Sequence, residues 1–572
     1  MHAPLLLHDV APEPAAAQTP LEQADRRQEH DRDAGHVTMS EAAVVAVDVG
    51  TRSARAGVFS PDGCMLARAE HPIALNRPRP DHAEQSSDDI WSATAAAVRA
   101  ARAAAGVTEQ AVAGIAFDAT CSLVALDEGD RPASVSTTGE DRWNVVAWLD
   151  HRAIAEAEAC TASGHSVLDW LGGTMSPEME IPKLMWLKRA RPEAWRRYRR
   201  ILDLADFLSF RACGSNARSC CTLTCKWTYL AHQEPGWQDD FLALVGLADL
   251  SARTAVPAHA SPIGAPLGRL TEDAAAHLGL TTDCIVGCGL VDAHAGTLGV
   301  LGQALGRGGA ELDRNLALIA GTSTGHMALS AAPRRVKGVW GPYRDAVAPG
   351  LWLNEGGQSA TGGLLDHLLE WHAKGAALGP RGHAVVLERI AALRAEQGQA
   401  FADRLMVLPD FHGNRSPLAE PDALGVISGL SLDASLDSLA RLYFAAALGI
   451  ALGTRHILDA LNAAGYAIDR LHVAGGHTRN PLLMELYADA TGCAVTAPAE
   501  GTDAVLLGSA MVAAAAAGLH PDLRAAATAM AQAGTTRQPD PARRDAYTRR
   551  YRAFLHMHEH RRALDSILGH DA

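Results

Sequence analysis

Short apolar runs separated by turn residues are the first regular pattern along the chain. Residues 42–49 form a Val-rich apolar run that ends in Asp48-Val49-Gly50-Thr51, and a second run follows at 55–59. The turn sequence Ser60-Pro61-Asp62-Gly63 leads into a third run at 64–70. Apolar runs of this length joined by a Pro/Gly turn are typical of a β-hairpin. We therefore expect the fold to begin with a hairpin whose first strand ends in a small-residue loop.

The same pattern returns in the second half of the chain. A helical period over 88–104 and a buried strand at 112–116 follow the first hairpin. The apolar run 316–319 then ends in another small-residue loop, with a hairpin partner at 326–330 and a further strand at 471–473. Two halves that each open with strand, loop and strand predict duplicated α/β domains facing one cleft.

Length and local composition suggest where these domains begin and end. A chain of 572 residues is too long for one hydrophobic core. Residues 1–38 are rich in Ala, Pro, Gln, Asp and Arg without apolar periodicity, which predicts a disordered tail and leaves Met39 as an alternative start. Gly-rich polar sequence at 297–315 interrupts the pattern. We expect an N-terminal domain over 41–298 and a C-terminal domain over 308–555.

Charge and cysteine usage exclude several classes of protein. A formal charge of −14 argues against a nucleic-acid or anionic-membrane surface, and the apolar run 510–517 is too short and Ala-rich to span a bilayer. Ten cysteines in so long a chain are no disulfide scaffold. The densest group fits no usual zinc spacing, so we expect buried reduced thiols and a cytoplasmic protein: Cys213, Cys220, Cys221 and Cys225. The oligomeric state stays open between monomer and homodimer.

The first small-residue loop is a candidate phosphate site. No G-x-x-x-x-G-K-[ST] motif occurs, so a P-loop is excluded. In its place, Gly50 lets the backbone approach a phosphate, while Thr51 and Ser53 offer hydroxyl groups. Arg55 adds positive charge, and Asp48 stands where it could hold Mg²⁺ through water. The alternative is an ordinary entry into a hairpin.

Two further loops suit other parts of a nucleotide. Small residues around Gly321 and Thr322 follow a buried strand and could surround a terminal phosphate with backbone N–H groups. Gly475 and Gly476, with Asn480 leading into a helix, suit the base and ribose of a nucleotide. Three such loops across two similar halves are a more specific signal than any one of them.

Together these loops resemble the FGGY family of carbohydrate kinases, within the actin/Hsp70-like ATPase superfamily. The resemblance runs from about Val44 to about Gly518. It implies two RNase H-like α/β domains that flank a cleft, with ATP and Mg²⁺ as cofactors. The segment Gly501-Thr502-Asp503-Ala504 is similar to the family's closing segment beside the nucleotide, which implies a cofactor-binding role for Asp503.

The family resemblance also assigns the catalytic base. The segment 287–294 matches the place where the family carries its catalytic aspartate, which is Asp292 here. A sugar hydroxyl is a poor nucleophile, and a carboxylate that accepts its proton and aligns the attack assists phosphoryl transfer. We expect Asp292 to be this base and to support Mg²⁺; the alternative is a surface-loop aspartate.

Substrate choice depends on a second set of residues. The stretch 117–124 resembles the signature of a D-ribulokinase subgroup, and Lys226 and Glu355 stand at positions similar to substrate contacts in ribulokinases. For Lys226 the alternative is a solvated surface lysine. The resemblance, with Asp118 as an added acceptor, implies these substrate-binding residues: Asp118, Thr120, Cys121, Lys226 and Glu355.

The favoured reaction is ATP-dependent phosphorylation of D-ribulose to D-ribulose 5-phosphate. A kinase for another pentulose or polyol, such as L-ribulose, xylulose or ribitol, is the alternative within the class. A chaperone-like ATPase of the same superfamily would turn over ATP without a sugar. We expect a small-molecule sugar as the partner, and neither nucleic acid nor membrane.

Overall fold

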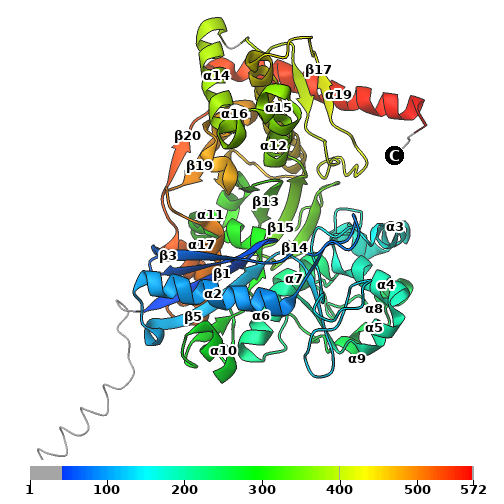
Figure 1. The fold of residues 1–572 in the computed structure, drawn as a ribbon, viewed down its shortest axis with the longest axis vertical. Coiled ribbons are helices and arrows are strands. Elements are labelled where there is room, and N and C mark those ends of the chain that lie inside the picture. Colours follow the sequence, from blue (N-terminus) through cyan, green and yellow to red (C-terminus); the bar gives the residue numbers. More distant parts are fainter. Residues whose placement is uncertain (1–41, 399, 570–572) are drawn as a thin grey trace, which may run out of the picture.

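The computed structural model describes residues 42–398 and 400–569, so the expected tail and Met39 lie outside it. The first half of the chain forms the lower lobe of Figure 1, around a seven-stranded sheet of order β3-β2-β1-β5-β10-β9 with β11 paired to β5. Its strands are β1 (Ala43–Val49), β2 (Ser53–Phe59), β3 (Met65–Pro72), β5 (Val112–Ala119), β9 (Pro266–Arg269), β10 (Ile285–Gly287) and β11 (Leu290–Val291).

The second half repeats this plan in the upper lobe. Its sheet has the order β14-β15-β13-β12-β18-β19-β20. Its strands are β12 (Asn315–Ala320), β13 (Thr324–Ser330), β14 (Trp340–Arg344), β15 (Trp352–Gln358), β18 (Arg470–Ala474), β19 (Ala494–Pro498) and β20 (Gly534–Arg537). In both sheets the first strand pairs antiparallel with the next strand of the chain and parallel with a later one. The predicted duplicated α/β fold is confirmed.

Helices and a small sheet complete the two lobes. The lower lobe adds a four-stranded sheet of β4 (Glu84–Gln85), β7 (Val145–Val146), β6 (Leu123–Leu126) and β8 (Arg200–Asp203). Helices of the lower lobe include α2 (Ser87–Ala105), α3 (Ile154–Ala162), α4 (Glu180–Ala190), α6 (Leu204–Cys213), α7 (Cys220–Lys226) and α10 (Glu272–Leu278). The C-terminal half adds α12 (Gly362–Trp371), α14 (Gly382–Gln397), α15 (Leu436–Ala463), α16 (Pro481–Thr491), α17 (Ala504–Ala516), α18 (Leu523–Met530) and α19 (Arg544–Ile567).

The helix at 88–104 was predicted to within one residue at each end. Ser86 caps α2 by accepting the Asp89 N–H, and Gly106 ends the helix in the left-handed region. Both devices satisfy backbone groups that a helix end leaves unpaired. The face of α2 that carries Ile90, Trp91 and Val98 is buried against the first sheet.

Most of the segment 297–315, where we expect the boundary between the domains, is helical, and the boundary itself stays a prediction. Helix α11 (Asp292–Arg307) crosses from the first half to the second, and its glycines serve close packing rather than a linker. A Cβ added at Gly299 would lie 2.0 Å from the Ala504 carbonyl oxygen, and one at Gly302 would lie 2.4 Å from that of Ala527. Glycine therefore lets α11 contact α17 and α18 backbone to backbone.

One helix among the described residues is long and apolar enough to cross a membrane by length and composition. This helix, α15, has 72% of its most apolar 18-residue window buried inside the protein. It packs against β16 (Met406–Leu408), α14 and α16 in the second hydrophobic core. Burial in this core accounts for the length and the apolar composition of α15.

Candidate active site

Two carboxylates meet at the carboxyl end of the first sheet. The parallel pairing of β1 with β5 sets Asp48 directly opposite Asp118, and both side chains are buried. Arg55, on the neighbouring strand, lies 2.8 Å from Asp48 and offsets part of this charge. Burial still dominates and raises the pKa of Asp48 to about 7, while burial and the Asp48 charge raise the pKa of Asp118 well above its usual range.

The structure therefore places Asp118 with the predicted magnesium ligand Asp48. The Ser509 hydroxyl, on α17, donates to Asp118 Oδ2 at 2.5 Å. Two carboxylates in one buried site disfavour each other's charge, which adds to burial in raising the pKa of Asp118. The sugar-binding role of Asp118 stays a prediction.

Asp292 stands at the first residue of α11, at the edge of the same cluster. Its Oδ1 accepts the Ala293 N–H at 2.7 Å, and the positive end of the helix favours a carboxylate at this position. The side chain is partly exposed. Burial raises its pKa, and its charge in turn contributes to the raised pKa of Asp48. Asp292 is thus a partly exposed carboxylate at a helix N-terminus rather than in a surface loop, and its role as the base stays a prediction.

The carboxylate cluster is chemically suited to a magnesium ion. Among the described residues, Asp48 Oδ1 and Asp118 Oδ1 are buried oxygens without a hydrogen-bond partner. Mg²⁺ prefers carboxylate and water oxygens, and an unpaired buried acceptor is costly unless something binds it. Asp48, with Asp292 nearby, fits the predicted magnesium ligands.

The first predicted phosphate loop, at Gly50–Thr51, is held by side chains from two other segments. The Gly50 N–H closes the turn on Ser53 O at 3.0 Å. Thr51 accepts from the Trp148 indole at 2.9 Å through Oγ1 and from the Gln85 side chain at 2.8 Å through its carbonyl. Arg55 forms an ion pair with Asp48, and its predicted contact with a phosphate stays a prediction.

The second predicted phosphate loop, at Gly321–Thr322, contains the same kind of internal hydrogen bond, and further hydrogen bonds hold its carbonyl groups. The Gly321 N–H donates to Ser323 O at 2.8 Å. The Gly321 carbonyl accepts from Gly362 N at 3.1 Å and from His477 Nε2 at 3.0 Å, and the Thr322 carbonyl accepts from Thr361 N at 3.0 Å and Gly363 N at 3.1 Å. These bonds occupy the carbonyl oxygens of Gly321 and Thr322. The backbone N–H of the exposed Thr322 is then the next group along the loop that could donate to an anion.

The third loop packs directly on the second. Gly475 has φ +87°, and a Cβ there would lie 2.5 Å from the Ala320 carbonyl oxygen, so only glycine fits. Gly476 begins a short 3₁₀ turn, and Asn480 ends it by capping α16 with its side-chain oxygen on Leu482 N and Leu483 N. The predicted cofactor residues of this loop thus adjoin the predicted phosphate loop, with Asn480 already used as a helix cap.

Asp503 joins the first half to the second. It caps α17 by accepting the Leu506 N–H, and its carboxylate lies 3.3 Å from Arg68 on β3. Its charge also raises the pKa of Asp48, which places it near the carboxylate cluster. The predicted role of Asp503 beside the nucleotide stays a prediction.

Lys226 and Glu355 come together from the two lobes. Lys226 ends α7 and is buried, with its Nζ 4.7 Å from the centre of the Trp340 ring, so it is not a surface lysine. Glu355 lies on β15 and accepts from His294 Nε2 at 3.4 Å. Burial opposes the Glu355 carboxylate, but the Lys226 charge and the His294 hydrogen bond lower its pKa to about 2. Of the other predicted substrate residues, Thr120 and Cys121 are almost fully buried beyond the end of β5.

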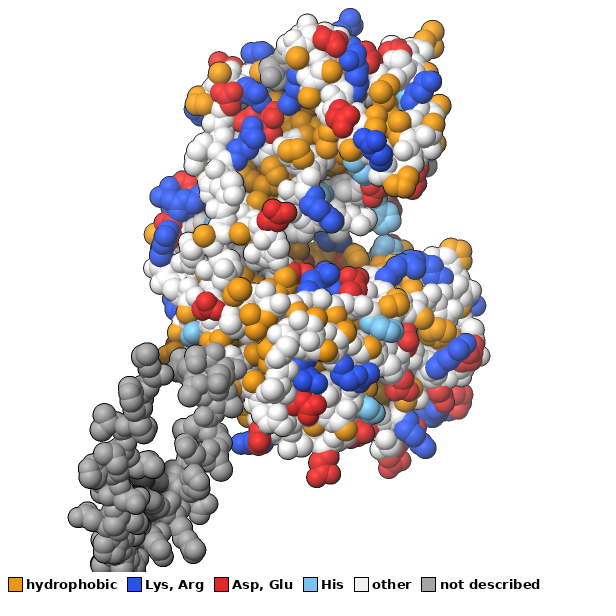
Figure 2. All heavy atoms as spheres, turned by 60° about the vertical axis from the view of Figure 1, so that its left-hand side comes forward, with side chains coloured by type: hydrophobic (Ala, Val, Ile, Leu, Met, Phe, Trp, Pro, Cys, Tyr) orange, Lys and Arg blue, Asp and Glu red, His pale blue; other side chains and the backbone are white. Residues whose placement is uncertain are grey.

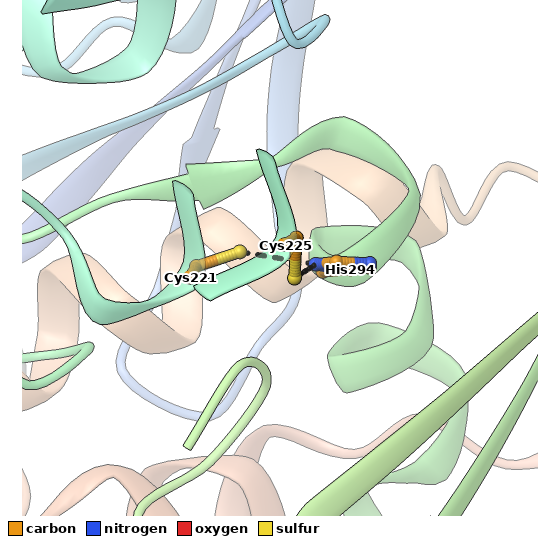
Figure 3. Close-up of side chains that lie close together, drawn as sticks. All are labelled: Cys221, Cys225 and His294. Atoms are coloured by element: carbon orange, nitrogen blue, oxygen red, sulfur yellow. Dashed lines mark hydrogen bonds between the residues drawn. The ribbon is translucent and has the colours of Figure 1, made fainter. Parts of the chain in front are cut away.

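A cysteine pair lies behind these residues. Cys221 and Cys225, four residues apart on α7, direct their thiols at the His294 ring on α11 (Figure 3). Cys221 Sγ is 3.0 Å from His294 Nδ1, and Cys225 Sγ is 4.0 Å away. All ten cysteines are free, and the four of the dense group are buried except for the half-buried Cys213. The described residues supply three soft ligands here and no fourth, so the pattern is short of a structural zinc site.

An ion pair bridges the two lobes beside this site. Figure 2 shows a hollow between the lobes. Arg415, in a loop of the upper lobe, lies 2.8 Å from Glu178 in the lower lobe. Its guanidinium also lies 5.3 Å from the centre of the Trp340 ring, which is the ring that Lys226 approaches. This ion pair between the lobes therefore lies next to the predicted sugar residue Lys226.

Several residues of the site were missed from the sequence. The Gly362-Gly363 pair had a readable signal, a small-residue loop ahead of an apolar helical pattern. Thr361 contacts residues that lie 37 to 40 positions earlier, and the hydrogen-bond and ion-pair partners of His294, Arg415 and Ser509, like the Gly321 partner of His477, are more than 60 residues away. These missed residues are Thr361, Gly362, Gly363, Trp340, His294, His477, Arg415 and Ser509.

Sequence comparisons agree with this geometry. The N-terminal domain model of the FGGY family of carbohydrate kinases matches residues 43–299, and the C-terminal domain model matches residues 316–517. The chain belongs to the FGGY family of carbohydrate kinases. An FGGY carbohydrate kinase domain-containing protein of Danio rerio is 44% identical over 542 residues, which cover 92% of this chain and 98% of that protein.

Several of these relatives carry a sugar in their names. A D-ribulokinase of Saccharomyces cerevisiae is 38% identical over 511 residues, covering 82% of this chain and 71% of the yeast protein. The xylulose kinase of Rhodospirillum rubrum has a TM-score of 0.72 at 25% identity, covering 92% of this chain and 99% of that chain. The carbohydrate-kinase fold and activity class predicted from the sequence are confirmed.

Proposed function

We propose that this carbohydrate kinase transfers the γ-phosphoryl group of ATP to D-ribulose, giving D-ribulose 5-phosphate and ADP. The observation that carries the proposal is that Glu355 contacts His294, two residues after Asp292 on α11, while Lys226 lies over the Trp340 ring, whose residue pairs with Glu355 in the second sheet. The identity to a D-ribulokinase supports the choice of sugar. Ten free cysteines are consistent with a reducing cytoplasm.

In this proposal the chain supplies a base, a sugar clamp and an anion site. Lys226 donates to sugar oxygens and Glu355 accepts from sugar hydroxyls, which orients one hydroxyl toward Asp292. The Asp292 carboxylate takes the proton of that hydroxyl as its oxygen attacks. The Thr322 amide donates to the phosphoryl oxygens. A magnesium ion, when bound by Asp48 and Asp292, would neutralise phosphate charge.

Approach of the lobes would exclude water, which competes with the sugar for the phosphoryl group. The Arg415–Glu178 pair spans the lobes on this side. A chaperone-like ATPase would turn over ATP without sugar, and a buried lysine–glutamate pair in the cleft would then have no role.

A single substitution tests the base. Asp292→Asn keeps the shape of the side chain but removes its basicity, so kcat is expected to fall by about 10²–10⁴ with little change in either KM. The matched control is Asp283→Asn, which removes a carboxylate from the exposed turn before β10 and leaves kcat unchanged. Steady-state ADP release with D-ribulose measures both. A kcat for Asp292→Asn within about threefold of the wild type would overturn the assignment.

A further inference from the structure

The Cys221 thiol contacts two segments that carry predicted functional residues. Its Sγ lies 3.0 Å from His294 Nδ1. The same sulfur accepts the backbone N–H of Val291 at 3.4 Å, and Val291 is the residue immediately before Asp292. Cys221 is fully buried on α7, the helix that ends in Lys226. The Cys221 sulfur therefore connects α7, which ends in Lys226, to the start of α11, which carries Asp292.

His294 continues this contact to the carboxylate of the sugar site. Its ring is fully buried, and both ring nitrogens have partners. Nδ1 faces Cys221 (Figure 3), and Nε2 lies 3.4 Å from Glu355 Oε2. A carboxylate only accepts hydrogen bonds, so Nε2 carries the hydrogen and donates it to Glu355. The sulfur at Nδ1 fixes the rotation of the ring that makes this donation.

We propose that Cys221 and His294 are positioning residues for the sugar site, with Cys221 holding His294 and His294 holding the Glu355 carboxylate. The inference rests on the proposed function, in which Glu355 binds the sugar. A glutamate at the end of three rotatable bonds loses side-chain entropy when a ligand fixes it. A hydrogen bond that fixes it beforehand reduces this cost and so increases affinity for the sugar.

The relay links the two lobes through three different elements. Cys221 belongs to α7, His294 to α11 and Glu355 to β15 of the second sheet. Metal coordination is the competing use of the same atoms, since two thiols and an imidazole face one another. A metal centre would hold one equivalent of a thiophilic ion, whereas a positioning relay works with none.

The relay predicts a selective change in sugar affinity. Cys221→Ala should raise KM for D-ribulose about five- to tenfold, with KM for ATP unchanged, which is the size of effect expected for the loss of one hydrogen bond. Cys221→Ser, which keeps a hydrogen-bonding group, should recover part of this loss. His294→Gln, which keeps an amide donor toward Glu355, should retain more affinity than His294→Leu.

The matched control is Cys160→Ala, which removes another fully buried thiol, on α3. Melting temperatures of both alanine variants separate lost packing from lost positioning. A double-mutant cycle combines Cys221→Ala with Glu355→Gln, two residues that touch only through His294. The relay predicts that the two effects on KM do not multiply, because once Glu355 is changed the thiol has nothing to position.

Each outcome decides between the relay and its competitors. Equal KM for D-ribulose in Cys221→Ala and Cys160→Ala would overturn the relay, and so would multiplicative effects in the cycle. One equivalent of zinc retained in the purified enzyme, measured by mass spectrometry, would show a metal centre instead. Failure of Glu355→Gln to change KM for D-ribulose would overturn the proposed sugar site itself, which is a separate result.

Discussion

The two sheets of this kinase carry opposite chemistry at equivalent positions. In the first sheet, β1 pairs with β5 so that Asp48 lies opposite Asp118. In the second, β12 pairs with β18 so that Ile319 lies opposite Ala474. The residues that follow are nevertheless alike, with Gly-Thr after the first strand in each half. The same strand and turn plan therefore presents two buried carboxylates in one lobe and two apolar side chains in the other.

The predicted phosphate loops of the two lobes contain the same internal hydrogen bond but are held in place by different groups. The first glycine of each loop donates to a serine carbonyl, at 3.0 Å for Gly50 and 2.8 Å for Gly321. Side chains hold the first loop, whereas backbone N–H groups of residues 361–363, together with the His477 ring, hold the second. The uncharged loop at Gly321–Thr322 suits a nucleotide, which itself carries a high negative charge. The carboxylates Asp48 and Asp118 of the other lobe suit a cation or a proton.

The largest expected effect lies in the acidic lobe. Asp48→Asn should lower kcat by about 10² or more, because stabilisation of phosphoryl charge by a metal is worth several kcal/mol. Steady-state ADP release at saturating substrates measures this loss. A kcat close to that of the wild type would show that Asp48 is not part of the chemistry.

The same variant should change how stability depends on pH. Burial, partly offset by Arg55, raises the pKa of Asp48 to about 7 from an ordinary value near 3.8. Between these values the folded protein holds a proton that the unfolded chain has released, so the free energy of unfolding falls as pH rises from about 4 to 7. Asp48→Asn removes this term, and its Tm should decline less between pH 5 and pH 8. An equal decline in both proteins would contradict the assigned pKa.

A smaller effect is expected for sugar affinity at the meeting of the lobes. Lys226→Met keeps the length of the side chain but removes its charge. KM for D-ribulose should rise about 10- to 100-fold with KM for ATP nearly unchanged, as expected for one lost hydrogen bond to a charged group. Lys188→Met is the control, because Lys188 pairs with Asp249 at the surface. A parallel rise in both Michaelis constants for Lys226→Met would show general damage to the cleft.

The smallest effect tests the backbone cradle. Gly475→Ala places a Cβ against the Ala320 carbonyl and should raise KM for ATP roughly tenfold, since strain of this kind costs about 1–3 kcal/mol. Gly492→Ala has a similar φ of +76° but open space around its Cβ, so it carries the backbone strain without the clash. Comparing the KM for ATP of the two variants separates the effect of the clash with Ala320 from the effect of backbone strain. Equal KM values for ATP would contradict a role for the cradle.

The sequence could predict local structure better than the partners of each residue. The hairpins, α2 and the three small-residue loops follow from apolar runs and turn residues, which are local signals. The glycines of α11 do not by themselves show a helix, because glycine can mark either a linker or a helix packed closely on another, and only the position of α17 distinguishes the two. Asp118 shows the same limit: its place beside Asp48 follows from the register of two strands about 70 residues apart.

The most direct test of the central claim is the acceptor preference of the purified full-length kinase. Coupled ADP release is measured with ATP and Mg²⁺ against D-ribulose, L-ribulose, xylulose, ribitol, glycerol and a hexulose, with a sugar-free control. We predict that D-ribulose gives the highest kcat/KM and that ADP release without sugar is negligible. A higher kcat/KM with xylulose or glycerol, or full turnover without any acceptor, would contradict the proposed D-ribulose kinase.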